Sequence, residues 1–141
     1  MYYRGFTLLE MLVVLVIIGL VASLVGPQLL GRVDTSRVTA ADAQIRMLKG
    51  ALDTLRLDIG RFPSQEEGLS VLVDSPSDER TRRRWQGPYL AEGVPADPWG
   101  NPYQYKPKDS ISVFLYSFGA DGKSGGEGID ADVGFLETET Q

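Results

Sequence analysis

The strongest candidate for chemistry is an acidic, glycine-rich segment near the C-terminal end, residues 119–134. Its four carboxylates belong to Asp121, Glu127, Asp130 and Asp132. Carboxylates on so flexible a chain repel one another unless a cation joins them, and Ca²⁺ takes about six to eight oxygen ligands, backbone carbonyls included. Asp121 and Asp132 match the first and last positions of an EF-hand loop, but Lys123 and Gly125 stand where that loop needs oxygen-bearing side chains. Spacing alone therefore leaves a cation site and a solvated turn equally open.

A second candidate is Glu10, the one carboxylate in the apolar run from Phe6 to Val25. At about 1.5 Å per helical residue the run measures about 30 Å, which is the thickness of a bilayer's hydrocarbon core. A charge in that core costs roughly 2.5 kcal/mol or more, so such an acid usually has a partner. The run holds no Lys, Arg or His. The partner must come from elsewhere, unless the run is a plain anchor that tolerates its acid.

The residues before the run are not those of an ordinary secretory signal. The small residue Gly5 precedes the apolar stretch, and no A-x-A-like cleavage site follows it. The string RGFTLLE, from Arg4 to Glu10, resembles the start of type IV pilin-like precursors. That resemblance implies that a prepilin peptidase/methyltransferase cleaves after Gly5 and methylates Phe6. It also implies that Glu10 faces the terminal amine of a neighbouring subunit in a filament.

The elements that follow begin with a helix. Pro27, flanked by Gly26 and Gly31, predicts a kink or a locally melted segment over residues 26–31. Beyond a possible N-cap at residues 34–36, the apolar positions alternate three and four apart; they are Val38, Ala41, Ile45, Leu48, Leu52, Leu55 and Ile59. This spacing predicts one narrow stripe on a helix that ends at Gly60. The stripe fits either a coiled-coil seam or a helix packed on its own sheet, and the globular region that follows favours the sheet.

The rest of the chain predicts loops and a small sheet. Seven prolines between residues 61 and 110 predict loops with short helices, one of them over residues 65–73 with Leu69 and Leu72 turned inward. The best strand is residues 111–118, and residues 103–106 would form a hairpin with it. The expected fold class is α+β, with a long N-terminal helix packed on a small antiparallel β-sheet.

The charges argue against nucleic-acid binding. Four arginines lie between Arg80 and Arg84, but Asp78 and Glu79 adjoin them and the whole chain has a net charge of −5. An acidic surface does not favour binding to nucleic acid in general. We therefore expect the arginine cluster to be a solvated turn or a contact with an acidic neighbour.

Residues 98–102, Pro-Trp-Gly-Asn-Pro, are typical of a turn whose aromatics close the core. Together with RGFTLLE and the GADG string at residues 119–122, they resemble the major pseudopilins of the type II secretion system over essentially the whole chain. The resemblance favours the calcium site over the solvated turn. Its implied ligands are Asp121, Asp130 and Asp132, with the backbone carbonyls of Phe118 and Lys123.

The resemblance also sets the expected organisation. Residues 1–5 are the leader, residues 6–25 the membrane-spanning and polymerisation helix, and residues 26–141 one periplasmic headgroup. The single span starts in the cytoplasm and crosses the bacterial inner membrane, a direction that Arg4 ahead of the span also favours. No cysteine is present, so packing or a metal must do the work of disulfides.

The expected function is structural, because the chain has no His or Cys for the usual catalytic bases and thiols. Gly122-Lys123-Ser124 ends like a P-loop, but Ser117 stands where that motif needs glycine. By resemblance the chain forms a helical homopolymer that drives folded proteins through an outer-membrane secretin. Its further partners are minor pseudopilins, membrane lipid and an inner-membrane platform with a cytoplasmic ATPase. The alternatives are a type IV pilin or competence pseudopilin, and a membrane-anchored periplasmic binding module that does not polymerise.

Overall fold

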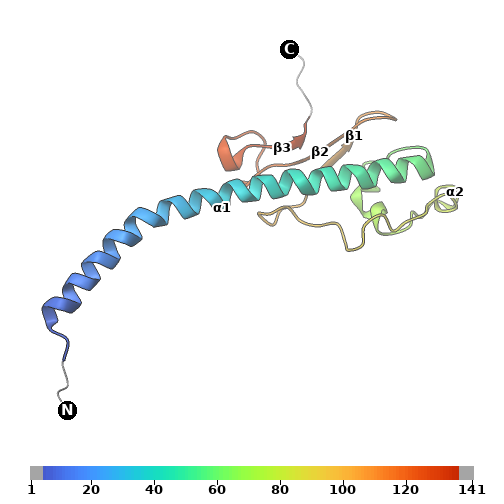
Figure 1. Ribbon diagram of the computed structural model, residues 1–141. Coiled ribbons are helices and arrows are strands. Elements are labelled where there is room, and N and C mark those ends of the chain that lie inside the picture. Colours follow the sequence, from blue (N-terminus) through green and yellow to red (C-terminus); the bar gives the residue numbers. More distant parts are fainter. Residues whose placement is uncertain (1–4, 137–141) are drawn as a thin grey trace. The chain divides into compact units, whose positions relative to one another are not determined.

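The computed structural model describes residues 5–136, and for residues 26–32 it describes the backbone alone. The chain divides into two compact units, Met1–Ser36 and Arg37–Gln141. The first element, the 52-residue helix α1 (Leu8–Ile59), contributes residues to both units. Figure 1 shows this helix and the strands of the second unit. The helix ends where the sequence predicts, because Gly60 adopts a φ of 87° and its N–H donates to the Arg56 carbonyl at 2.8 Å.

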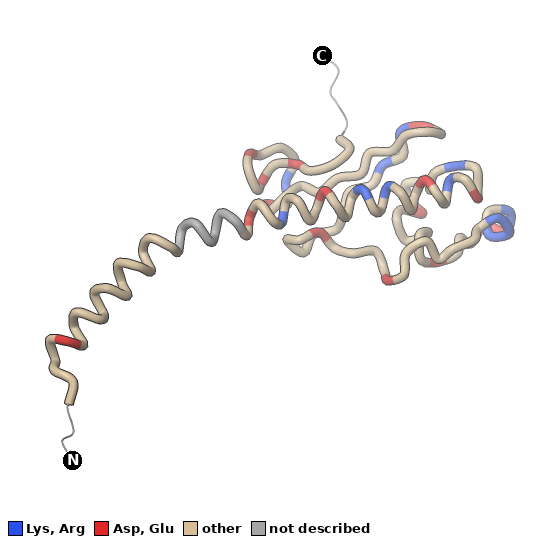
Figure 2. Tube along the Cα trace, in the orientation of Figure 1, with Lys and Arg blue, Asp and Glu red and all other residues tan. Residues whose placement is uncertain are grey.

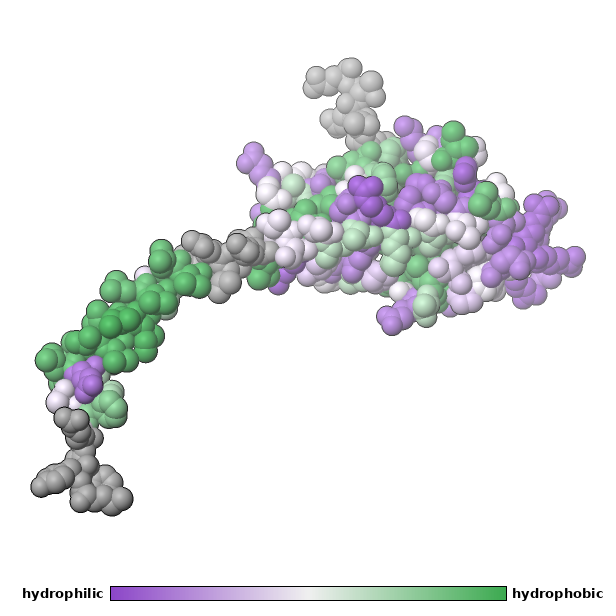
Figure 3. Space-filling model, viewed as in Figure 1, coloured by the Kyte–Doolittle hydropathy of each residue, from purple (hydrophilic) through white to green (hydrophobic). Residues whose placement is uncertain are grey.

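From Leu8 onward, the described residues of the first unit form the first part of α1, which is apolar as far as Val25. Residues Leu8–Val25 have a mean hydropathy of 2.9, are long and apolar enough to cross a membrane, and include no residue that is buried inside the protein. Figure 3 shows this stretch as a hydrophobic surface. At its start the Thr7 hydroxyl accepts the Glu10 N–H at 3.2 Å, a side-chain cap of the first turn.

The backbone is helical through residues 26–31, so the predicted melted segment is wrong. Proline removes its own N–H and therefore one helical hydrogen bond, which the remaining bonds of a long helix can absorb. The helix also runs through residues 34–36, so the predicted N-cap there is wrong as well. The kink at Pro27 stays a prediction.

In the second unit the predicted stripe is the core of the protein. Ile45, Leu48, Leu52 and Leu55 are each 0% exposed and pack in one cluster with residues of the sheet. Burying one such side chain stabilises a fold by about 1.5–3 kcal/mol. The helix therefore packs on its own sheet, as the sequence analysis favoured, and does not leave its stripe as a coiled-coil seam.

The sheet has three antiparallel strands in the order β1-β2-β3. They are β1 (Gln104–Pro107), β2 (Val113–Ser117) and β3 (Val133–Phe135). The predicted hairpin of the first two strands is confirmed, with Tyr105 opposite Leu115. Strand β3 was not predicted, because three residues around a glycine carry only a weak strand signal.

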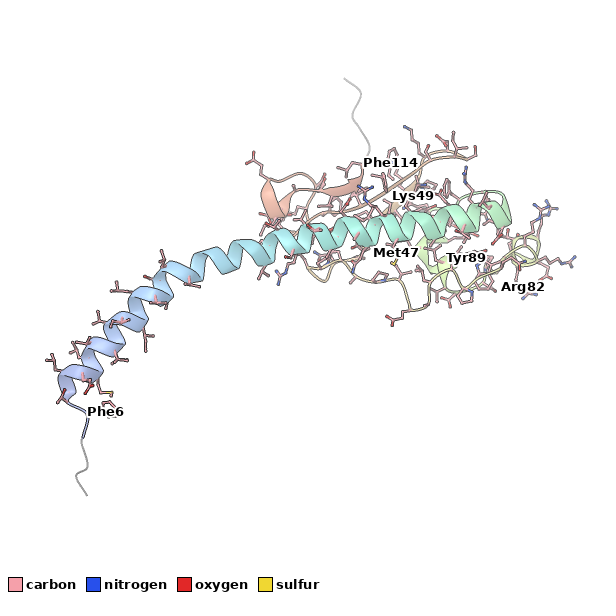
Figure 4. All side chains as sticks on the ribbon, in the orientation of Figure 1. Phe6, Met47, Lys49, Arg82, Tyr89 and Phe114 are labelled. Carbon is pink, nitrogen blue, oxygen red and sulfur yellow. The ribbon has the colours of Figure 1, made fainter. Side chains whose placement is uncertain are left out.

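The segment between α1 and the sheet is mostly loop, as its prolines predict. The helix expected over residues 65–73 is a shorter 3₁₀ helix, η1 (Gly68–Leu72), with Leu72 buried and Leu69 packed on the core. A four-residue helix, α2 (Glu79–Arg82), follows. The Tyr89 hydroxyl donates to Asp58 near the end of α1 at 2.7 Å, and Figure 4 labels this tyrosine beside the helix. The loop is thereby fastened to α1.

Candidate functional site

The N-terminal candidates lie at the start of α1. Phe6 is 76% exposed, and Gly5 is also exposed. Figure 4 labels Phe6 just before the first turn of the helix. Glu10 stands in the first turn of the helix, where the dipole favours a negative charge. Among the residues that the structure describes, no cationic side chain forms an ion pair with Glu10. Its carboxylate is therefore available to a partner from outside this copy of the chain.

The C-terminal candidate is a closed loop between β2 and β3. It contains a short 3₁₀ helix, η2 (Gly128–Asp130), and its two ends are joined because the Ala120 N–H donates to the Ile129 carbonyl at 2.9 Å. Gly126 has a φ of 88°, and a Cβ there would lie 2.4 Å from the Asp130 carbonyl oxygen. Only glycine allows this approach, so the backbone carbonyls on one side of the loop lie close to the backbone of its other side.

The predicted metal ligands are spread around this loop. Asp121 is exposed, and its Oδ1 accepts the Lys123 N–H at 3.0 Å. Asp132 Oδ2 accepts the Gly125 N–H at 3.1 Å, whereas Asp132 Oδ1 is buried and has no hydrogen-bond donor among the described residues. Asp130 is the last residue of η2. The backbone of Phe118 lies at the entrance of the loop, directly after β2.

Within the described residues, no three acidic side chains gather into a group that could hold a metal ion. The loop instead offers one buried, unpartnered carboxylate oxygen, that of Asp132, together with closely approaching backbone carbonyls. A buried acceptor without a donor costs about 1–3 kcal/mol, and a cation would remove that cost. Ca²⁺ accepts both carboxylate and carbonyl oxygens. The donor set therefore fits a cation held by few carboxylates and several carbonyls better than one held by three carboxylates.

Asp97 was missed in the sequence analysis. This carboxylate is 4% exposed, and it accepts hydrogen bonds from the backbone N–H groups of Trp99 and Asn101 and from the Ser117 hydroxyl. Burial raises the pKa of nearby Tyr103 to about 12, and the charge of Asp97 adds to that rise. The sequence did contain a signal for this role. Asp97 directly precedes the turn at residues 98–102, and an aspartate in that position commonly accepts a hydrogen bond from the backbone two residues on.

The arginine cluster surrounds α2, where Figure 2 shows a concentration of positive charge. Asp78 caps this helix by accepting from the side chain and backbone of Thr81, and these hydrogen bonds lower the pKa of Asp78. Glu79 pairs with Arg82 at 2.5 Å and with Arg83 at 3.3 Å. No residue of α2 is buried, which agrees with the predicted solvated turn.

Comparison with known proteins matches nearly the whole chain. Residues 28–136 match the family described as type II secretion system (T2SS), protein G, and residues 1–26 match the prokaryotic N-terminal methylation motif. The type II secretion system core protein G of Pseudomonas aeruginosa is 45% identical over 131 residues, which are 92% of both chains. That of Vibrio cholerae is 44% identical over 131 residues, which are 92% of this chain and 89% of the relative.

A solved structure agrees with these relatives. The crystal structure of the major pseudopilin from the type 2 secretion system of enterohaemorrhagic Escherichia coli matches with a TM-score of 0.59 and 33% identity. The match covers 76% of this chain and 92% of the E. coli chain. The fold and the resemblance expected from the sequence are both confirmed. The chain therefore belongs to the protein G family of the type II secretion system, the family of its major pseudopilins.

Proposed function

We propose that this chain polymerises through its N-terminal helix into the pseudopilus, as the major subunit of that helical filament. Its family supports the role of major pseudopilin. The observation that supports assembly is the apolar surface of Leu8–Val25, of which no residue is buried inside the protein. Such a surface needs lipid before assembly and other copies of the same helix afterwards. A repeated head-to-tail contact that does not close produces a fibre.

Glu10 gives the assembly step its direction. Once the chain is cleaved after Gly5, the methylated amine of Phe6 carries a positive charge. Pairing that amine with Glu10 of the adjacent copy offsets the cost of holding the acid in an apolar environment. The pair also fixes the stagger between copies, because each chain supplies one acid and one amine at a set separation along the helix.

The test of this proposal is Glu10→Gln, which keeps the size of the side chain and removes its charge. We expect normal membrane insertion but loss of filaments in electron micrographs and loss of secretion. Ser23→Ala is the matched control, because the Ser23 hydroxyl donates to the Leu20 carbonyl of its own helix. Filaments of normal number and length from Glu10→Gln would show that the acid has no part in assembly. Mass spectrometry of the mature N-terminus tests separately whether the chain begins at methylated Phe6.

The proposed setting is the bacterial inner membrane, with one span and a periplasmic head that contains the second unit, Arg37–Gln141. The methylation motif and the apolar helix support anchoring in the membrane. Minor pseudopilins would join the filament, an inner-membrane platform with a cytoplasmic ATPase would drive its growth, and an outer-membrane secretin would pass the exported proteins. A binding module that does not polymerise would leave the Glu10→Gln variant fully active, so the same experiment distinguishes this alternative.

The head is proposed to hold calcium in the loop between β2 and β3. Asp132 and Asp121 would supply carboxylate oxygens, with Asp130 and the carbonyls of Phe118 and Lys123 as further donors. The buried, unpartnered Oδ1 of Asp132 supports this proposal. The ion would cross-link the two ends of the loop and hold it in one conformation for contact with the next subunit.

Melting temperatures of the full chain in detergent test the calcium proposal. We expect the parent to melt higher in calcium than in chelator, and Asp132→Ala and Asp121→Ala to lose most of this difference. Asp74→Ala is the control, because it removes an exposed acid outside the loop. Equal melting temperatures of the parent with calcium and with chelator would contradict the proposal.

A further inference from the structure

Asp97 is a buried carboxylate outside the proposed cation site. Its Oδ1 accepts the Asn101 N–H at 2.8 Å and the Trp99 N–H at 3.1 Å, and its Oδ2 accepts the Ser117 hydroxyl. The backbone closes the same turn, because the Asp97 N–H donates to the Asn101 carbonyl at 2.8 Å and the Gly100 N–H donates to the Asp97 carbonyl at 2.9 Å. Asp97 therefore holds the turn before β1 and the last residue of β2 together.

Two residues bonded to Asp97 extend to the start of the glycine-rich loop. The Oγ of Ser117, which is 0% exposed, accepts the Gly119 N–H at 3.1 Å. The side-chain amide of Asn101 donates to the Gly119 carbonyl at 3.4 Å. Both polar backbone groups of Gly119 are thus held by residues that Asp97 itself holds.

Gly119 is the point where the two ends of the loop meet. Its φ is 72°, and a Cβ there would lie 2.7 Å from the Ile129 carbonyl oxygen and 2.8 Å from that of Ala131. A shift of Gly119 would therefore move it against the carbonyls at the far end of the loop. Its two neighbours in the chain are Phe118 and Ala120, and the Ala120 N–H makes the hydrogen bond that closes the loop.

We propose that Asp97 is a positioning residue for the cation site of the loop. Acting through Ser117 and Asn101, it fixes Gly119, and Gly119 sets the spacing between the entrance of the loop and the carbonyls that approach it from the exit. This inference rests on the proposed calcium site. Asp97 does not contact the ion. Partners of this kind typically change metal affinity about 10- to 100-fold, because they orient ligands that would otherwise be mobile.

The experiment measures calcium affinity of the full chain in detergent by isothermal titration calorimetry, alongside melting temperature in chelator. The variants are Asp97→Asn, which keeps the shape but loses the charge, and Ser117→Ala, which removes the link to Gly119. The control is Tyr105→Phe, which removes a buried hydroxyl bonded to the Pro63 carbonyl at 2.8 Å, a bond that involves no residue of the loop.

We expect all three variants to melt lower in chelator, but only Asp97→Asn and Ser117→Ala to bind calcium about 10- to 100-fold more weakly. Should Asp97→Asn not fold, Asn101→Ala takes its place, because it removes the second link and leaves Asp97 intact. Parental calcium affinity in the variants that fold would show that Asp97 is merely structural and would overturn the inference. A parent that binds no calcium would instead overturn the cation site itself, and the positioning role with it.

Discussion

The two parts of α1 have the same secondary structure and opposite surroundings. In Leu8–Val25 apolar residues occupy every face and none is buried; Leu15, for example, is 69% exposed. In the part that belongs to the head, the buried apolar residues form one stripe, and Leu48 on that stripe is 0% exposed. The arrangement of apolar residues therefore decides whether a helix completes the protein's own core or needs an outside partner.

The charges of the two parts differ in the same way. On the outer faces of the head helix, Arg46 pairs with Asp42 at 2.8 Å and Lys49 with Asp53 at 2.6 Å, one helical turn apart. Glu10 has no such pair among the described residues. The head balances these charges internally, whereas the N-terminal helix presents both its apolar surface and its acid to whatever surrounds it.

Of the variants that test this difference, the largest loss of stability should come from one that creates a cavity in the head. Leu52→Ala removes a fully buried side chain, and we expect the free energy of unfolding to fall by about 2–5 kcal/mol. Leu15→Ala makes the same chemical change in the exposed part of the helix and should leave the unfolding of the head unchanged. Denaturant titration of both variants in detergent measures the difference. Similar losses from the two variants would show that the head depends on the N-terminal helix for its stability.

The next largest difference in stability between the two parts should come from glycine substitutions. Gly126→Ala forces a side chain into a left-handed conformation and against the Asp130 carbonyl, so we expect a loss of roughly 1–3 kcal/mol. Gly19, in the N-terminal helix, has nothing within 4 Å of the position of a Cβ. Gly19→Ala should therefore leave the melting temperature of the head within error of the parent's. An unchanged melting temperature for Gly126→Ala would mean that the loop rearranges freely.

A smaller effect should depend on pH. Arg61 donates to both carboxylate oxygens of Glu67, at 2.6 and 2.9 Å, and these hydrogen bonds lower the pKa of Glu67 below its ordinary value of 4.5. A lowered pKa means that the stabilisation is complete above about pH 4.5 and is lost as the pH falls through the pKa of the folded state.

Glu67→Gln should thus cost about 1 kcal/mol at neutral pH and progressively less in acid, since the pair is partly exposed. Glu66→Gln, which changes an exposed neighbouring acid, is the control. Urea titrations from pH 3 to pH 7 give the measurement. A cost for Glu67→Gln that stays constant across this range would mean that the ion pair is not its source.

The smallest effect should come from the surface of α2. Arg82 and Glu79 are each 56% exposed, and exposed pairs contribute little, so Arg82→Ala should change the free energy of unfolding by less than about 0.5 kcal/mol. The difference should shrink further in high salt because salt screens exposed charges. Denaturant titrations at low and high salt test this, and a loss above about 1 kcal/mol would mean that the arginine cluster supports the fold.

Patterns that repeat along the chain were predicted well. The apolar run, the stripe from Ala41 to Ile59, the end of the helix at Gly60 and the hairpin of β1 with β2 follow from local periodicity and turn residues. The melted segment at residues 26–31 was wrong, because the sequence marks the proline but not how well the rest of a long helix holds its bonds. The grouping of Asp121, Asp130 and Asp132 around calcium stays a prediction.

The sequence by itself determined which surfaces are apolar and with what period, because side-chain type and spacing are local properties. Only the tertiary structure decided that Asp97 meets Ser117, twenty positions further along the chain, and that Asn101 reaches Gly119. It also decided that Val133–Phe135 becomes a strand, because an otherwise weak segment pairs with β2. Such contacts depend on the closure of long loops and on burial, and the buried, hydrogen-bonded state of Asp97 exists only once the strands and turns around it have come together.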